Sequence, residues 1–126
     1  MIRIAIVEDD TGYRSQLGKY IDQYQSDFSE TVSVSEFSDG LEIVEKYKSE
    51  YDIILMDIQM PVMDGVRAAA AIRSCPKSYG QTVLIVAMTA DAFINVHGGA
   101  LSDFNDYIIK PVKPDELYAK LINNLK

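Results

Sequence analysis

The chain has 126 residues, 48% of them hydrophobic and 25% charged, which suits one globular domain with an apolar core rather than a disordered segment. Its formal net charge of −7 argues against a direct nucleic-acid interface and against adsorption to an anionic membrane, both of which favour basic surfaces. The single cysteine, Cys75, excludes an internal disulfide, and no apolar run approaches the roughly 18 residues of a transmembrane helix. With no signal peptide recognisable, we expect a cytoplasmic protein of one domain, residues 1–126.

Predicted strands and amphipathic helices alternate along the chain. The first strand is expected at 2–7, and the helix after it, capped by Asp10 or Thr11, carries apolar residues at helical spacing from Tyr13 to Phe28. Further strands are predicted at 31–37, 53–56, 82–88 and 107–109, with helices at 41–48 and 66–74. The segment 91–101 contains two adjacent glycines and is expected to form a short or irregular helix. A last helix opens at Pro114, and its buried stripe is expected to contain Leu117, Leu121, Ile122 and Leu125.

This alternation of strands with helices indicates an α/β domain. Such βα units join parallel strands through right-handed crossovers, which places helices on both faces of one sheet. The carboxyl ends of parallel strands meet at one edge, where open α/β sheets place their ligands. We therefore expect the residues that follow each strand to lie together at that edge.

Charged and hydroxyl side chains stand at four of these strand ends. Glu8 and Asp9 follow the first strand, Asp57 follows the third, Thr89 the fourth and Lys110 the fifth, while Asp10 is assigned to the helix cap. Converging carboxylates repel one another, and a hard divalent cation relieves that repulsion; oxygen ligands, few of them from the protein, suit Mg²⁺. A carboxylate such as Asp57 can also attack phosphorus when a metal ion and an ammonium group mask its charge.

Four motifs occur in order along the chain: VEDD at 7–10, LMDIQMPVMDG at 55–65, MTA at 88–90 and DYIIKP at 106–111. In this combination the chain resembles a response-regulator receiver domain, the CheY-like phosphoaspartate switch of two-component signalling, over essentially all 126 residues. The resemblance implies a single flavodoxin-like (βα)5 domain with a parallel five-stranded sheet of order 2-1-3-4-5. It also implies that Asp57 takes a phosphoryl group, with Mg²⁺, from a histidine kinase or a phosphotransfer histidine. Such a domain catalyses only its own phosphorylation and dephosphorylation.

The same resemblance assigns roles to individual residues of the site. Asp9, Asp57 and the backbone carbonyl of Gln59 would bind Mg²⁺ directly, and Glu8 would act through water. Lys110 would neutralise charge opposite the metal ion, directed inward by a cis peptide bond to Pro111, which costs about 0.5–1 kcal/mol.

Residues around the phosphoryl group are assigned in the same way. Thr89 would donate a hydrogen bond to it, and Tyr107 is the switch aromatic; Gln59 and Asp91 would flank the incoming water or phosphodonor. The alternatives are that Thr89 is an ordinary strand residue and that Tyr107 only packs on a half-buried strand. The switching output surface is expected around the segment 91–101, the fifth strand and the last helix.

Three other classes of protein fit parts of the pattern. A hydrolase of the haloacid-dehalogenase type needs a second aspartate two residues after its aspartate nucleophile, and Gln59 at that position cannot protonate a leaving group. An FMN-binding flavodoxin needs a phosphate loop after the first strand, where Glu8 and Asp9 would repel a phosphate. The third class is a receiver-like scaffold that is never phosphorylated. The presence of the complete set argues against it: Glu8, Asp9, Asp57, Thr89 and Lys110.

The resemblance leaves the output open. MIRIAIVEDD is similar to receivers that precede LytTR-type DNA-binding domains, whereas LMDIQMPVMDG and NDYIIKPVKPDEL are more similar to receivers of hybrid histidine kinases. A chimera, natural or engineered, and a receiver excised from its output domain are two hypotheses for the origin of the chain. The expected partners are a sensor histidine kinase or phosphotransfer protein and an unknown output domain or target. We expect no direct contact with nucleic acid or membrane, and a phosphorylation-dependent homodimer is a further hypothesis.

Overall fold

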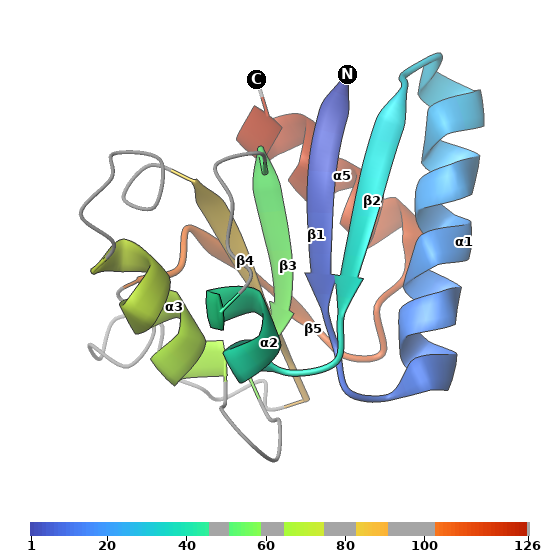
Figure 1. Cartoon of the computed structure of the whole chain (residues 1–126). Coiled ribbons are helices and arrows are strands. Elements are labelled where there is room, and N and C mark those ends of the chain that lie inside the picture. The colour runs from blue at the N-terminus through green and yellow to red at the C-terminus, as the bar shows by residue number, and fades with distance from the viewer. Residues whose placement is uncertain (46–50, 59–64, 75–82, 91–102, 126) are drawn as a thin grey trace.

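A parallel five-stranded sheet organises the protein, and its strand order is 2-1-3-4-5, as the family resemblance implies. The computed structural model describes residues 1–45, 51–58, 65–74, 83–90 and 103–125 (Figure 1). The strands are β1 (Ile2–Val7), β2 (Val32–Phe37), β3 (Ile53–Asp57), β4 (Leu84–Thr89) and β5 (Asp106–Ile109). Because all five strands run in one direction, their carboxyl ends lie at a single edge of the sheet.

Helices cover both faces of this sheet. The helix α1 (Thr11–Phe28) lies on the same face as α5 (Pro114–Leu125), and α2 (Gly40–Glu45) and α3 (Gly65–Arg73) cover the opposite face (Figure 1). Successive side chains of a strand point to opposite faces. On β3, Ile53 and Leu55 therefore enter the apolar layer under α1 and α5, while Ile54 and Met56 enter the layer under α2 and α3. We call these the α1/α5 layer and the α2/α3 layer.

The ends of α1 follow from its sequence. Asp10 is the N-cap, with its side chain accepting a hydrogen bond from the Tyr13 backbone N–H at 2.9 Å, and this confirms the predicted capping role. Ser29 closes the helix in the left-handed conformation at φ 53°. The predicted apolar stripe is buried at Leu17, Ile21 and Tyr24, but Phe28 at its end is 44% exposed.

Most of the other predicted bounds agree with the structure within two residues. The strand β4 begins at Leu84 rather than at residue 82, and α3 begins at Gly65. In α5, Leu117 and Leu121 are buried, whereas Ile122 and Leu125 are partly buried against the α1/α5 layer. The predicted irregular helix at 91–101 lies outside the described residues. No helix in the described part of the chain is long and apolar enough to cross a membrane.

Asn105 and Arg73 fix the start of β5. The Asn105 backbone N–H donates to the Ile85 carbonyl at 2.8 Å, and its side-chain oxygen accepts from the Ile85 N–H at 2.8 Å. The guanidinium of Arg73, at the end of α3, donates to the Asn105 side chain at 2.8 Å and to the Val83 carbonyl at 2.7 Å. These bonds hold β5 beside β4 and so determine where Lys110, at the far end of β5, lies.

Candidate functional site

Asp57 is the last residue of β3, between β1 and β4, and is only 3% exposed. Directly after it, the Ile58 N–H donates to the Met88 carbonyl at 3.2 Å and the Gly65 N–H donates to the Ile58 carbonyl at 3.2 Å. A Cβ at Gly65 would clash with the Asp57 carbonyl oxygen and lie 2.8 Å from the Ile58 Cα. The start of α3 is therefore packed against the backbone that carries Asp57, which only glycine permits.

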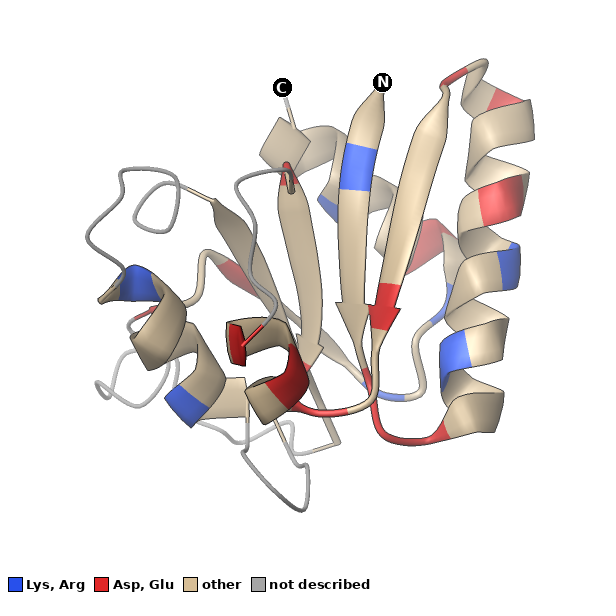
Figure 2. Ribbon diagram, in the orientation of Figure 1, with Lys and Arg blue, Asp and Glu red and all other residues tan. Residues whose placement is uncertain are grey.

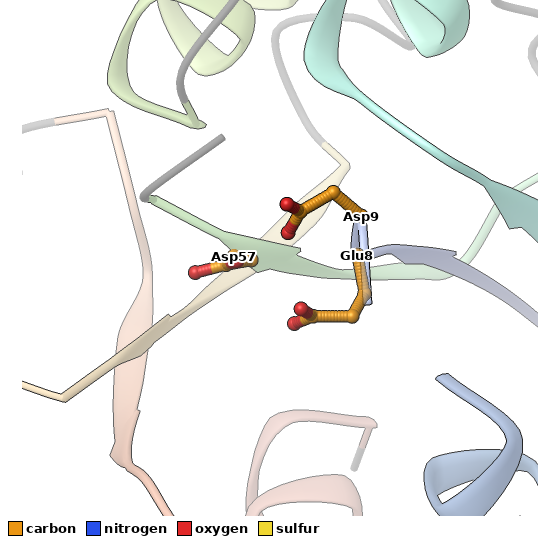
Figure 3. Close-up of side chains that lie close together, drawn as sticks. All are labelled: Glu8, Asp9 and Asp57. Carbon is orange, nitrogen blue, oxygen red and sulfur yellow. The ribbon is translucent and has the colours of Figure 1, made fainter. Parts of the chain in front are cut away.

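Three carboxylates converge at this edge of the sheet. Glu8 and Asp9 follow β1, which is paired with β3, so that they lie beside Asp57 as the sequence predicted (Figure 3). One oxygen from each of the three carboxylates lies within 4.8 Å of the others. Asp and Glu also extend along the connection from β1 to α1 (Figure 2). Glu8 is 1% exposed, whereas Asp9 is exposed, so the cluster is open to solvent on one side.

The cluster has the chemistry of a site for a hard divalent cation. Its donors are all oxygens, they are few, and the exposed side leaves room for metal-bound waters, which Mg²⁺ retains. Of the expected ligands, Glu8, Asp9 and Asp57 are brought together, whereas Gln59 lies outside the described residues.

Lys110 brings a positive charge to the site. Its ammonium nitrogen lies 3.0 Å from Glu8 Oε2 and 3.4 Å from Asp57 Oδ1. The Lys110–Pro111 peptide bond is cis, as predicted, and the Lys110 N–H donates to the Thr89 carbonyl at 2.7 Å. Lys110 therefore faces the acids from the side of β5.

The neighbouring charges and the burial of this site shift the pKa values of Lys110 and Glu8. Burial alone would lower the pKa of Lys110, but its hydrogen bond to Glu8 and the negative charges of Asp57 and Glu8 outweigh burial and raise that pKa. Burial raises the pKa of the Glu8 carboxyl, the hydrogen bond from Lys110 opposes this, and the charge of Asp57 adds to it. A cation in the cluster would offset the repulsion between Glu8 and Asp57.

Thr89 and Tyr107 occupy two neighbouring strands. Thr89 is the fully buried last residue of β4, at the same edge as Asp57. Tyr107 lies on β5 and is 37% exposed, with the Lys120 ammonium 5.5 Å from its ring centroid. Thr89 is thus at the site, and Tyr107 is on the surface of the adjacent edge strand. Asp91, expected to flank the phosphodonor, lies outside the described residues.

Two residues at the start of α1 also reach the site, and their roles were not predicted from the sequence. Arg14 donates to the Glu8 carbonyl at 2.6 Å and pairs with Glu36 at 3.1 Å. The Tyr13 hydroxyl accepts a hydrogen bond from the Val112 N–H at 2.7 Å, and the Lys110 ammonium lies 4.6 Å from the Tyr13 ring centroid. The helical spacing predicts only an apolar role for Tyr13, although its place in the first turn after the Asp10 cap puts it at the edge where the strands end.

Comparisons with known proteins agree with this arrangement. Residues 4–122 match the response regulator receiver domain family. The chain is 44% identical over 69 residues (54% of its length) to hybrid signal transduction histidine kinase I of Dictyostelium discoideum. It is 34% identical over 131 residues (98% of its length) to transcription factor SKN7 of Saccharomyces cerevisiae. The chain spans only 4% and 18% of the lengths of these two relatives.

A solved structure has the same fold. The receiver domain of sensor histidine kinase PA1611 from Pseudomonas aeruginosa PAO1, with a magnesium ion coordinated in its active-site cleft, superimposes with a TM-score of 0.83. The two chains are 30% identical, and the likeness covers 98% of this chain and 97% of the other. The chain therefore belongs to the response regulator receiver domain family of two-component signalling, whose members occur in response regulators and in hybrid histidine kinases.

Proposed function

We propose that residues 1–126 form one receiver domain that is phosphorylated on Asp57. The observation that carries the proposal is the position of Asp57, a buried carboxylate at a strand end with Glu8 and Asp9 beside it and the Lys110 ammonium 3.4 Å away. A carboxylate so placed can act as a nucleophile because positive charge near it reduces its repulsion of an anionic phosphoryl group.

The reaction transfers one phosphoryl group. An Asp57 oxygen forms a bond to phosphorus while the bond from phosphorus to the donor nitrogen of a phosphohistidine, or to the donor oxygen of an acyl phosphate, breaks. The bonding pair leaves with the donor atom. When the donor is a phosphohistidine, the released imidazole nitrogen takes a proton from solvent. Lys110 offsets charge on the phosphoryl oxygens, and the Thr89 hydroxyl donates to one of them after transfer.

Magnesium fits the acidic side of the site. Asp9 and Asp57, with the backbone carbonyl of Gln59, would bind the ion directly and Glu8 would act through water. Bound there, Mg²⁺ would supply charge neutralisation and a fixed direction of approach for the phosphoryl group.

The phosphodonor is proposed to be a sensor histidine kinase or a phosphotransfer protein, and the domain would catalyse no reaction beyond its own phosphorylation and dephosphorylation. Tyr107 would follow Thr89 on phosphorylation and change the surface of β5 and α5, either for an output domain or for a second copy of the chain. The domain is proposed to serve a response regulator, with a hybrid histidine kinase as the alternative, and relatives named as each kind match the chain. The cytoplasmic location stays a prediction.

Labelling with a small acyl phosphate tests the proposal. Wild-type protein incubated with acetyl phosphate and Mg²⁺ should gain one phosphoryl group by intact mass, and Asp57→Ala should gain none. Asp52→Ala is the matched control, because Asp52 precedes β3 and pairs with Arg3 on the surface. Labelling of Asp57→Ala at the wild-type yield would refute the assignment of the phosphoacceptor.

A further inference from the structure

We propose that Tyr13 is a positioning residue for phosphoryl transfer, holding the Lys110 ammonium beside Asp57 through its ring and the chain after Lys110 through its hydroxyl. This inference rests on the proposed function of Asp57 and adds to it a residue of α1. Three contacts of this residue carry it.

The first contact is between the hydroxyl and the loop that follows β5. Tyr13 Oη accepts a hydrogen bond from the Val112 N–H at 2.7 Å, across 99 positions of sequence. Val112 is 3% exposed, so its N–H has little access to water and depends on this partner. The bond ties the beginning of α1 to the backbone two residues after Lys110.

The second contact is between the ring and the ammonium. Lys110 Nζ lies 4.6 Å from the Tyr13 ring centroid, within the range of a cation–π interaction. The same nitrogen is 3.0 Å from Glu8 Oε2 and 3.4 Å from Asp57 Oδ1. The ring therefore bounds the ammonium on one side while the two carboxylates attract it from another.

The third contact anchors the ring itself. Tyr13 is partly buried and packs against the α1/α5 layer, and it is the residue whose N–H is capped by Asp10. A ring fixed at its base and at its hydroxyl has few positions available. It can therefore restrict a lysine side chain, which otherwise has many rotamers.

Restriction of Lys110 matters because its ammonium must change from one negatively charged partner to another during the reaction. In the structure the ammonium contacts Glu8 most closely, whereas phosphorylation places new negative charge on Asp57. A lysine held within reach of both acids serves the transfer with little rearrangement, and loss of the ring would let the ammonium move toward solvent. Tyr13 acts through Lys110 and does not itself touch the reacting atoms.

A series of variants on α1 tests this assignment. Tyr13→Phe keeps the ring and removes the hydroxyl, and Tyr13→Leu removes both. Tyr20→Phe and Tyr20→Leu are the matched controls, because Tyr20 lies on the same helix and packs against the same layer farther along it. For each variant, the rate of phosphorylation by acetyl phosphate is measured against Mg²⁺ concentration, and urea unfolding reports stability.

We expect Tyr13→Leu to lower the maximal rate at saturating Mg²⁺ on the order of tenfold, with the apparent Mg²⁺ affinity changed less than about twofold. Tyr13→Phe should retain most of the rate because the ring remains, but it should lower the free energy of unfolding because the buried Val112 N–H loses its acceptor. The Tyr20 variants should lose stability without losing rate. A wild-type rate in folded Tyr13→Leu, or an equal loss in Tyr20→Leu, would overturn the assignment.

A second readout does not depend on phosphorylation. In the wild type and in Tyr13→Phe, the ring current should move the NMR signals of the Lys110 ε-methylene upfield, and Tyr13→Leu should abolish this shift. Wild-type protein that shows the shift but gains no phosphoryl group would refute the proposed function of Asp57. Unshifted Lys110 signals in the wild type would instead refute the placement of Lys110 by Tyr13.

Discussion

The Lys110 ammonium lies 3.0 Å from the Glu8 carboxylate and is closer to it than to Asp57, at 3.4 Å. The pair joins residues 102 positions apart, from the first strand end to the last. The Glu8 side chain is 2% exposed and the Lys110 side chain 17%, so neither charge is well solvated. The pair therefore keeps Lys110 at the site before any phosphoryl group is present.

Removal of Lys110 should destabilise the metal-free protein. Lys110→Met leaves the buried acids Glu8 and Asp57 without their cation, and we expect the free energy of unfolding to fall by about 3 kcal/mol, the lower end for broken buried pairs. Urea unfolding measures this, with exposed Lys113→Met as the control. Added Mg²⁺ should recover part of the loss, and a variant as stable as the wild type without Mg²⁺ would contradict the electrostatic account.

Magnesium should stabilise the wild type. The ion relieves carboxylate repulsion in the native state only, so the free energy of unfolding should rise by about 1.4 kcal/mol at ten times the dissociation constant. Thermal melts with and without Mg²⁺ should show an upward shift that Asp9→Ala abolishes. Asp10→Ala should lose about 1 kcal/mol from the helix cap yet keep the shift. A shift retained in Asp9→Ala would remove Asp9 from the ligand set.

Gly65→Ala should disturb the site, and Gly18→Ala should not. The new Cβ at residue 65 would clash with the Asp57 carbonyl oxygen, whereas nothing lies within 4 Å of a Cβ at residue 18. We expect Gly65→Ala to destabilise by about 1–3 kcal/mol and to slow phosphorylation, because the backbone of Asp57 must move. Gly18→Ala, inside α1, should stabilise by about 0.5–1 kcal/mol. Equal stability of the two variants in urea would show that the close approach of α3 is not maintained in solution.

Acid should weaken the packing of β5 on α5 through Asp106. Burial alone would raise the pKa of Asp106, but hydrogen bonds from Lys120, Asn124 and the Tyr107 N–H outweigh it and lower that pKa. The folded pKa is thus below the unfolded one, so the stabilisation is present above the unfolded value of about 3.9 and is lost as pH falls through the folded value.

Asp106→Asn tests this dependence. The variant should be less stable than the wild type at neutral pH, and the difference should shrink as the pH is lowered from 5 toward 3, in urea titrations at each pH. Exposed Asp22→Asn controls for the loss of one carboxylate. A constant difference between wild type and Asp106→Asn across this range would exclude the carboxylate as its source.

The sequence predicted the sheet and the acids well, because both depend on short patterns. Strand ends of a parallel sheet share an edge, so the positions of Glu8, Asp57 and Lys110 followed from alternation and motif alone. The roles of Tyr13 and Arg14 could not be predicted in this way, since their contacts depend on the rotation of α1 about its own axis. The exposure of Phe28 could not be predicted either, because the helical spacing does not show how far along α1 the α1/α5 layer extends.

The division of the core into two layers has a consequence for how the domain tolerates change. The layers draw on alternate residues of the same strands and are separated by the sheet, so substitutions at Leu17 on α1 and at Ile72 on α3 should have nearly additive costs. A deletion that slips β3 by one residue is a different kind of damage. It would exchange the residues of both layers at once and turn Asp57 to the opposite face of the sheet, away from Lys110. The spacing of the chain before Asp57 is thus a stricter requirement than the identity of any single core side chain.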